Sequence, residues 1–267
     1  MSILERSFEA LVNSIRQEFL SAPLVEGTKW QSTTAPQPMV EILNRSFTFD
    51  LRSETELSII ANAVKPNLPW ADRHFVEERV SGKPINPGET WKIWPYAASA
   101  AKHLREGENV PKYDHSYAER YWPKQAGNNA DGPFSAAGIR FPIGDLNDLI
   151  VTLMDDPLTR QAYLPIFFPE DTVAASIGKR VPCTLGYHII CREGLLHIVY
   201  PMRSCDFIRH FRDDVYLTIR LLLWVLEQLK KLDPETWIDV WPGTFRMHIT
   251  SLHMFKQDLE NMKAMLY

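Results

Sequence analysis

Apolar positions near the start of the chain recur with the period of a helix. Between Ile3 and Leu20 they return every three or four residues, which predicts an amphipathic helix over 3–20. The stretch 39–51, MVEILNRSFTFDL, alternates apolar and polar residues and predicts a strand or a bent pair of strands. Residues 70–80 again have a helical period, and the segment SGKPINPG ends that helix with glycines and prolines.

The second half of the chain predicts two further helices and several strands. Residues 146–157 form an amphipathic pattern, and 161–169 is β-like. Two β-branched runs flank Arg192-Glu193-Gly194 and predict a hairpin. The most apolar helix follows over 213–232, and its breadth of apolar surface predicts burial on most sides. A β-like segment over 236–255 and a short helix complete the chain.

The order of these elements indicates the α+β class. The strands are mostly consecutive and seldom alternate with helices. Because no linker rich in proline, glycine or serine divides the chain, we expect a single domain spanning 1–267. The polar region 107–138 is long for a loop within a compact domain, and such loops are more often functional than not.

Composition excludes several classes of protein. The chain has 267 residues, of which 45% are hydrophobic and 23% charged, as in an ordinary globular protein. A net charge of −4 predicts no direct binding of nucleic acid or of an anionic membrane. No segment resembles a signal peptide or a membrane span. Three cysteines at spacings that match no zinc pattern indicate reduced thiols and no metal, so we expect a cytoplasmic protein (in the host cytoplasm if the source is a virus).

Residues 180–226 hold all three cysteines and a cluster of polar side chains. Pro182-Cys183 precedes Arg203-Ser204-Cys205-Asp206 by twenty residues, and Asp213-Asp214 stand at the head of the buried helix. Taken singly, these motifs have ordinary explanations: a small buried hydrophobe, a solvated turn and a helix cap. Together they supply a nucleophile, an anion clamp and a group that could read a base.

The motifs and their order resemble the thymidylate synthase and deoxycytidylate hydroxymethylase family over residues 113–255. That family has Pro-Cys on a strand, Arg-Ser-x-Asp twenty residues later, and a base-reading position eleven residues after the arginine, here Asp214. Three further segments resemble family motifs: 116–119 a Tyr-Gly segment, 156–160 an Asp-Pro-x-Ser-Arg phosphate loop, and 248–253 a His-x-x-Ser-x-His motif.

The resemblance implies a thymidylate synthase-like fold, with a large mixed β-sheet packed on helices and one sheet face in a homodimer interface. It implies a nucleoside monophosphate as substrate and 5,10-methylenetetrahydrofolate as co-substrate. The Cys183 thiolate would add to C6 of a pyrimidine and make C5 nucleophilic. Tyr117 would order a water molecule or the pyrimidine on the Cys183 side.

The same resemblance assigns the remaining residues. The nucleotide would be bound by Arg203, Ser204, His248 and Thr250, and by Arg160 from the second subunit. Folate would contact Asp206, with Trp94 as its stacking partner. The family has a catalytic glutamate on a helix before this tryptophan; of Glu77 and Glu78 we choose Glu78. The neighbouring Arg79 is either a phosphate ligand or a solvated charge, and we favour the second interpretation.

Asp214 is the position that indicates which base is bound. Uracil-specific members of the family have Asn there, whereas a carboxyl group accepts from N4–H of cytosine and, if protonated, donates to N3. The competing interpretation is a helix cap, although Asp213 could be the cap while Asp214 turns inward. We therefore expect hydroxymethylation of dCMP or CMP. The alternatives are methyl transfer to the same base and thymidylate synthesis from dUMP.

The sequence departs from the family at three places; the first and the last of them motivate a non-enzyme alternative, a regulatory relative that only binds nucleotide, and the second leaves ribose or deoxyribose open. Thr184 follows the cysteine where the synthases have His, and Thr250 stands where the family has Tyr. The sequence ends at Tyr267, without the segment that closes over folate in synthases. A shorter lid would also admit water, which suits a hydroxymethylase.

Overall fold

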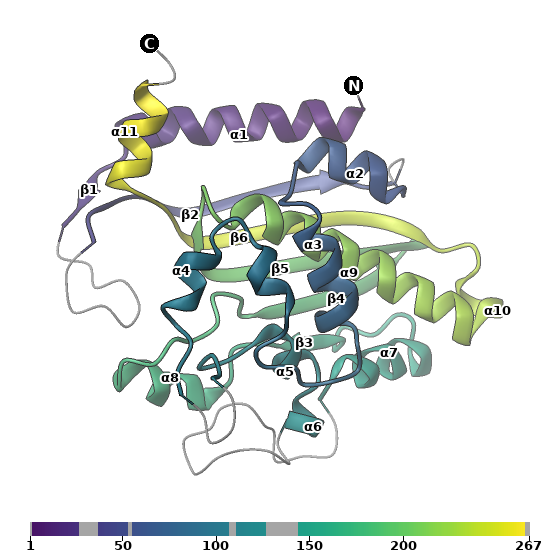
Figure 1. Cartoon of the computed structure of the whole chain (residues 1–267). Helices are drawn as coiled ribbons and strands as arrows, with labels where there is room; N and C mark the ends of the chain where they lie inside the picture. Colours follow the sequence, from purple (N-terminus) through teal and green to yellow (C-terminus); the bar gives the residue numbers. More distant parts are fainter. Residues whose placement is uncertain (1, 27–36, 53–54, 107–110, 127–143, 265–267) are drawn as a thin grey trace.

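One mixed β-sheet organises the chain in the computed structural model, which describes residues 2–26, 37–52, 55–106, 111–126 and 144–264 (Figure 1). Its strands are β1 (Leu24–Val25), β2 (Met39–Asp50), β3 (Tyr163–Pro165), β4 (Gly186–Arg192), β5 (Leu195–Asp206) and β6 (Trp241–Phe255). Their order is β1-β2-β6-β5-β4-β3. Neighbouring strands are antiparallel except β5 and β6, which are parallel and therefore need a crossover connection.

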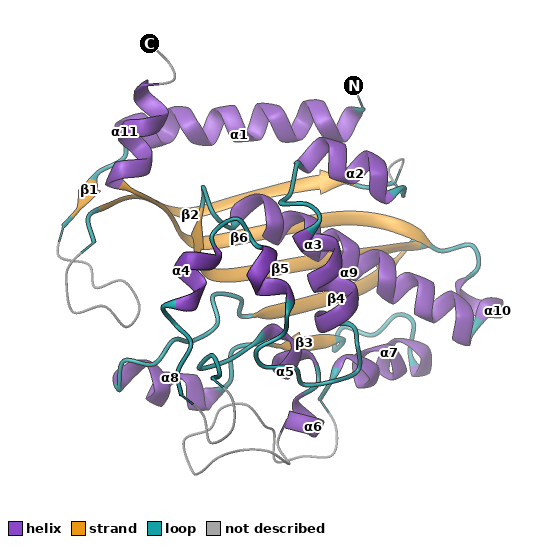
Figure 2. Cartoon of the chain, viewed as in Figure 1, coloured by secondary structure: helices purple, strands orange, loops and turns teal. Residues whose placement is uncertain are grey.

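Helices pack against this sheet (Figure 2). The longer ones are α1 (Ile3–Ser21), α2 (Leu57–Val64), α7 (Leu146–Asp155), α8 (Pro169–Ser176), α9 (Phe211–Leu232) and α11 (Lys256–Ala264). Short ones are α3 (Trp70–Arg73), α4 (Ala97–Ala101), α5 (Tyr117–Tyr121), α6 (Pro123–Ala126) and α10 (Pro234–Trp237), with a π-helix η1 (His74–Arg79) and a 3₁₀-helix η2 (Thr90–Ile93). No helix in the described ranges is long and apolar enough to cross a membrane.

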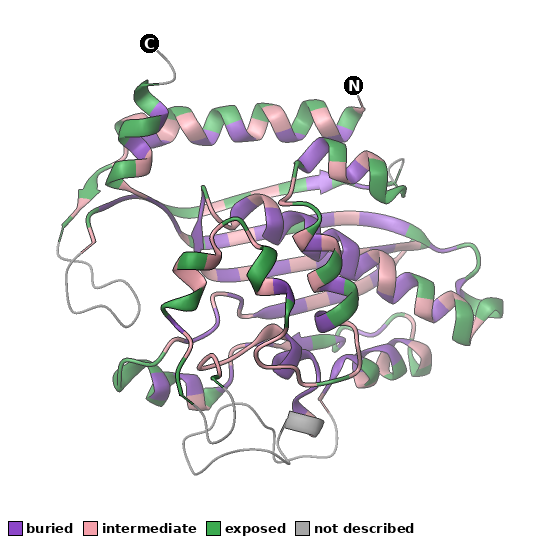
Figure 3. Ribbon diagram, in the orientation of Figure 1, coloured by how far each residue is buried: buried purple, intermediate pink, exposed green. Residues whose placement is uncertain are grey.

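The core lies between α9 and one face of the sheet. Helix α9 makes the β5–β6 crossover and packs on both strands, and most of its side chains are buried (Figure 3). Helix α1 joins this layer through Phe8, whose ring lies 6.0 Å from that of Phe211. Along β5 buried residues such as Ile198 and Tyr200 alternate with half-buried ones such as Val199. The second face of the sheet is therefore only partly covered within one chain.

Most of the long periodic segments are confirmed. Helices α1, α7 and α9, strand β2 and the β4–β5 hairpin lie where the sequence predicts them. The hairpin turns at Glu193 and Gly194, both with positive φ. The α+β class and the large mixed sheet are also confirmed. The predicted loop over 28–38 and the end of the 107–138 region lie mostly outside the described residues.

Other segments differ from the prediction. The helix expected over 70–80 is α3 continued by the π-helix η1. Of the β-like stretch 161–169 only three residues form a strand, and its last residue, Pro169, begins α8, where proline is favoured because the first turn needs no amide donor. Helix α2 was not predicted, because its eight residues are too few to establish a period.

Candidate active site

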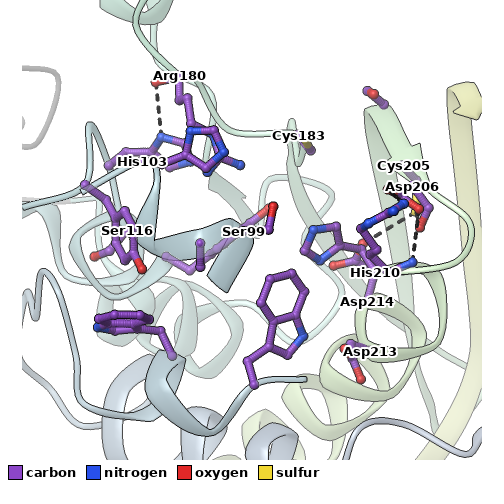
Figure 4. Close-up of a pocket in the computed structure, with 18 of the residues that line it drawn as sticks. Ser99, His103, Ser116, Arg180, Cys183, Cys205, Asp206, His210, Asp213 and Asp214 are labelled. Atoms are coloured by element: carbon purple, nitrogen blue, oxygen red, sulfur yellow. Dashed lines mark hydrogen bonds and ion pairs between the residues drawn. The ribbon is translucent and has the colours of Figure 1, made fainter. Parts of the chain in front are cut away.

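Most of the sequence-predicted site residues converge on one cavity of about 390 Å³ (Figure 4). Its walls come from the loop before β4, the end of β5, the first turn of α9 and the segments between 70 and 117. Eight of the predicted site residues line it: Glu78, Trp94, Tyr117, Cys183, Arg203, Ser204, Asp206 and Asp214. Residues separated by more than a hundred positions in sequence therefore face the same space.

Cys183 lies in the loop before β4, and Arg203 on β5 holds that loop. The backbone amide of Arg203 donates to the Cys183 carbonyl at 2.9 Å. Its guanidinium donates to the carbonyl oxygens of Val181 and Pro182 at 2.9 and 2.8 Å. The Nη2 atom also lies 3.8 Å from the Cys183 sulfur. Arg203 thus fixes the loop and places a cation beside the partly exposed thiol.

Ser204 and Asp206, which follow Arg203 on β5, have different environments. Ser204 Oγ lies 3.3 Å from Nδ1 of His253, a β6 residue that also lines the cavity. Asp206 accepts hydrogen bonds from the backbone amides of Ile208 and Arg209 and from the Arg209 guanidinium, at 2.9–3.0 Å. Its carboxylate therefore holds the turn between β5 and α9, in addition to facing the cavity.

The two acids at the start of α9 have separate roles. Asp213 does not cap α9, so that interpretation is wrong: its carboxylate accepts from the amide nitrogen and side chain of Asn67 at 2.7 and 2.8 Å. Asp214 turns into the cavity and is 8% exposed. Burial, with a smaller contribution from Asp213, raises the pKa of Asp214 to about 7, although Arg79 acts in the opposite direction. Asp214 is thus a carboxyl group that can be neutral near physiological pH.

The π-helix presents Glu78 and Arg79 together, and both are buried. The Glu78 carboxylate accepts from the amide and hydroxyl of Thr90 at 2.9 and 2.7 Å. A Cβ atom at position 88 would overlap the Glu78 carboxylate, so glycine there lets the carboxylate occupy this position. His74 Nε2 accepts from Arg79 Nε at 3.0 Å, so its Nδ1–H donates to Glu78 at 2.9 Å. Burial raises the pKa of Glu78, but these hydrogen bonds outweigh it and lower the pKa.

Arg79 is not the solvated charge that we favoured from the sequence. It is 3% exposed, and its guanidinium carbon lies 4.2 Å from the centre of the Tyr117 ring. No carboxylate forms an ion pair with it among the residues that the structure describes. The adjacent Tyr117 donates to or accepts from Thr184 Oγ1 at 2.9 Å, and Thr184 meets the Tyr200 hydroxyl at 2.8 Å.

Two tryptophans line the cavity on the side expected for folate. A flat pterin ring needs an aromatic face and a polar group at its edge, and Trp91, Trp94 and Asp206 supply these. One face of Trp94 is covered by His210, whose ring centre lies 4.9 Å away in a stacked arrangement. Trp91, which was not predicted from the sequence, also lines the cavity, and its ring meets that of Tyr113 edge-on at 6.3 Å.

Three predicted nucleotide ligands do not line the cavity of their own chain. Arg160 is exposed at the turn before β3, as a residue directed at a second subunit would be. His248 bonds through Nδ1 to Ser46 Oγ at 2.7 Å, and Thr250 is exposed. The β6 residues that do line the cavity are Ser251 and His253, so we do not carry His248 and Thr250 forward as ligands.

Several cavity residues were missed because nothing in their sequence context marks them. His74 carries a weak signal, its i,i+4 spacing to Glu78. His210 carries none; burial lowers its pKa to about 4, so it lines the cavity as a neutral ring. No cluster of His, Cys, Asp or Glu suited to a metal ion occurs in the described ranges.

Comparison with known proteins identifies the fold. No protein-family model and no curated protein matches the sequence. Among solved structures, thermostable thymidylate synthase A from Bacillus subtilis is similar with a TM-score of 0.62 and 15% identity, over 96% of this chain and 83% of that one. The fold is thymidylate synthase-like. The similarity includes the first hundred residues, to which the sequence resemblance does not extend.

Proposed function

We propose that this protein is a pyrimidine nucleotide C5 hydroxymethyltransferase that acts on dCMP or CMP with 5,10-methylenetetrahydrofolate. The observation that carries this proposal is the presence of Cys183 and the buried carboxyl of Asp214 in one cavity. The thymidylate synthase-like fold supports the broader class, a folate-dependent transferase acting at C5 of a nucleotide. The residues below supply the finer assignment.

Cys183 is the nucleophile in this proposal. Its thiolate adds to C6 of the pyrimidine, and the electrons of the C5–C6 bond make C5 the attacking atom. The Arg203 guanidinium, 3.8 Å from the sulfur, supplies the cationic setting in which a cysteine reacts as thiolate. Arg203 and Ser204 bind the 5′-phosphate, and we propose that Arg160 of a second subunit completes that site.

In this proposal the neutral, protonated form of Asp214 recognises the base. One carboxyl oxygen accepts from N4–H of cytosine, and the protonated oxygen donates to N3. The position of the pKa of Asp214, about 7, supports this assignment, because a substantial share of the carboxyl groups then carries a proton at physiological pH.

Folate supplies the one-carbon unit when it is bound, and Trp91, Trp94 and Asp206 would hold it. Glu78, kept ionised by His74 and Thr90, is placed to accept a proton or to order water in the cavity. Tyr117 orders water on the Cys183 side. Hydroxymethyl transfer differs from methyl transfer only in whether water or a hydride completes the new C5 substituent.

We propose a homodimer built on the partly covered sheet face. Side chains there, such as Ile190 and Val199, are half-buried within one chain and would be covered by a second copy. Mixing Arg160→Ala protein with Cys183→Ala protein tests the shared site. If subunits exchange, hybrid dimers should recover about a quarter to a half of the activity, and no recovery would contradict sharing.

The reaction is tested by turnover with dCMP, CMP and dUMP side by side. The proposal predicts a 5-hydroxymethyl product, identified by mass, from a cytosine nucleotide and not from dUMP. A 5-methyl product with a rise in dihydrofolate absorbance would identify a methyltransferase instead. Nucleotide binding without any product would indicate the regulatory alternative.

A further inference from the structure

Three side chains of one helical turn are joined by hydrogen bonds at the wall of the cavity. His74 begins the π-helix η1, and Glu78 and Arg79 end it. The Nε–H group of Arg79 donates to His74 Nε2 at 3.0 Å, and His74 Nδ1 lies 2.9 Å from Glu78 Oε2. All three residues line the cavity. The imidazole ring therefore joins a carboxylate to a guanidinium.

The π-helical turn is what brings Arg79 back beside His74. In an α-helix, with 3.6 residues per turn, the fifth residue after His74 would lie about 140° round the axis, on a different face. In η1 the turn is wider, because the amide of Val80 donates to the carbonyl of Phe75 at 3.1 Å, an i→i+5 bond. Residues i+4 and i+5 then lie on either side of residue i. Since π-turns are rare and frequently occur at functional sites, this one points to a joint role for the three side chains.

The hydrogen bonds fix the position of the proton on His74. A guanidinium only donates, so His74 Nε2 must accept and the ring proton must be on Nδ1. Nδ1–H then donates to Glu78 Oε2, and it lies at a longer distance of 3.2 Å from Thr90 Oγ1. Burial lowers the pKa of His74, which agrees with a neutral ring. His74 thus cannot take up a proton without losing its bond to Arg79.

The protein uses three of the hydrogen-bonding positions of the Glu78 carboxylate. Oε1 accepts from both the amide and the hydroxyl of Thr90, at 2.9 and 2.7 Å. Oε2 accepts from His74 alone among the residues that the structure describes. A carboxylate has about four lone-pair positions, two on each oxygen, so a single position on Oε2 is left. Because Glu78 lines the cavity, water or a ligand there can occupy that position.

We propose that His74 is a positioning residue that holds Glu78 and Arg79 in fixed orientations, so that Glu78 accepts a proton or a hydrogen bond at one position of Oε2. This inference rests on the proposed function, since it assumes that Glu78 acts on water or on a ligand during the reaction. A proton that leaves a water molecule in the cavity bonds to Oε2, and the carboxylate becomes neutral. His74 Nδ1–H keeps its acceptor in both states, because a protonated carboxyl oxygen retains a lone pair.

The first test is nucleotide turnover by variants that remove the bonds of His74 separately. His74→Phe loses both bonds and keeps a ring to stack on Trp70, whose ring centre lies 5.0 Å away. We expect kcat to fall about ten- to a hundredfold, part of what a positioned base contributes, with little change in nucleotide affinity. His74→Asn keeps a donor near the Nδ1 position and should recover most of this loss. His74→Gln reaches the Nε2 position and keeps only the bond to Arg79, so it should not.

A double-mutant cycle with Glu78→Gln separates positioning from a general effect on folding. If His74 acts through Glu78, adding His74→Phe to Glu78→Gln should lower kcat by less than about twofold more. His197→Phe is the matched control and should leave kcat unchanged, since His197 bonds to Thr244 Oγ1 at 2.9 Å and does not line the cavity. Additive losses, or no recovery in His74→Asn, would overturn the role of His74 while leaving the proposed function intact.

The tautomer of His74 gives a second measurement, which does not depend on activity. In heteronuclear NMR of the wild-type protein at pH 7 we expect a neutral ring with its proton on Nδ1. A ring protonated at Nε2, or at both nitrogens, would overturn the arrangement whatever the protein turns over. If the expected tautomer is found but the wild-type protein converts none of dCMP, CMP and dUMP, the proposed function is wrong, and the role of His74 in it is wrong too.

Discussion

Two buried arginines in this protein have contrasting surroundings. Arg120 forms a bidentate ion pair with Asp171 at 2.9 and 3.1 Å, and both side chains are 1% exposed. Arg79 is almost as buried, yet its guanidinium contacts neutral His74 and the rings of Tyr117 and Tyr121. The nearby Asp214 feels the charge of Arg79 but is not paired with it.

The difference separates a structural site from a functional one. At Arg120 each charge is neutralised within the chain, and Asp171 also accepts from the Phe168 amide at 2.7 Å, fixing the start of α8. The charge of Arg79 and the carboxyl group of Asp214, in contrast, both face a cavity, where a ligand can complete their interactions. Perturbed groups around a cavity are the usual mark of an active site.

The largest expected effect is a loss of turnover, and it distinguishes Cys183, which lines the cavity, from Cys191, which lies in the core. Cys183→Ala should lower turnover on the order of 10⁴-fold or more, because the covalent step has no substitute. Cys191→Ala is the control, since Cys191 is buried on β4 and does not line the cavity. Steady-state kinetics on both proteins give the comparison, and equal losses would remove Cys183 from its assigned role.

The next test compares the two arginines directly by urea denaturation. Arg120→Met leaves Asp171 buried without its partner and should lower the free energy of unfolding by about 3–5 kcal/mol. Arg79→Met leaves no acid without an ion-pair partner. It should lower the free energy of unfolding by about 1 kcal/mol, the contribution of the hydrogen bond from Arg79 to His74. Similar destabilisation of both variants would show that Arg79 is as structural as Arg120.

Asp214→Asn should change base preference by about ten- to a hundredfold, since one mismatched buried hydrogen bond costs about 1–3 kcal/mol. Activity on the cytosine nucleotide should fall and relative activity on dUMP should rise. The neighbouring Asp213→Asn is the control, because Asp213 bonds to Asn67 and should affect stability more than preference. Comparing kcat/KM for each nucleotide measures the change; an unaltered ratio in Asp214→Asn would remove the main support for cytosine.

The smallest expected effect is in the pH profile. If neutral Asp214 reads cytosine, kcat/KM should fall above pH 7, by about tenfold per unit well beyond the midpoint. Arg79→Met should move this midpoint upward, because Arg79 lowers the pKa of Asp214. A downward move in the variant would contradict the assignment of the midpoint to Asp214.

The sequence was informative where its signals are local or come as spaced motifs. Long periodic segments predicted α1, β2, the hairpin and α9, and the motif around Cys183 located most of the cavity. The setting of Arg79 was not predictable, because a π-helix and four distant tyrosines create it. The hydrogen bonds of Thr184 to Tyr117 and Tyr200 were equally hidden, since Thr184 and Tyr200 are brought together only when the loop before β4 lies against β5.

Tritium release from C5-labelled nucleotides tests the central claim most directly, because exchange at C5 requires the Cys183 adduct. The account predicts release from labelled dCMP or CMP in the presence of methylenetetrahydrofolate, and none with Cys183→Ala protein. Release at an equal rate by Cys183→Ala protein, or no release from dCMP, CMP or dUMP with the wild-type protein, would contradict it.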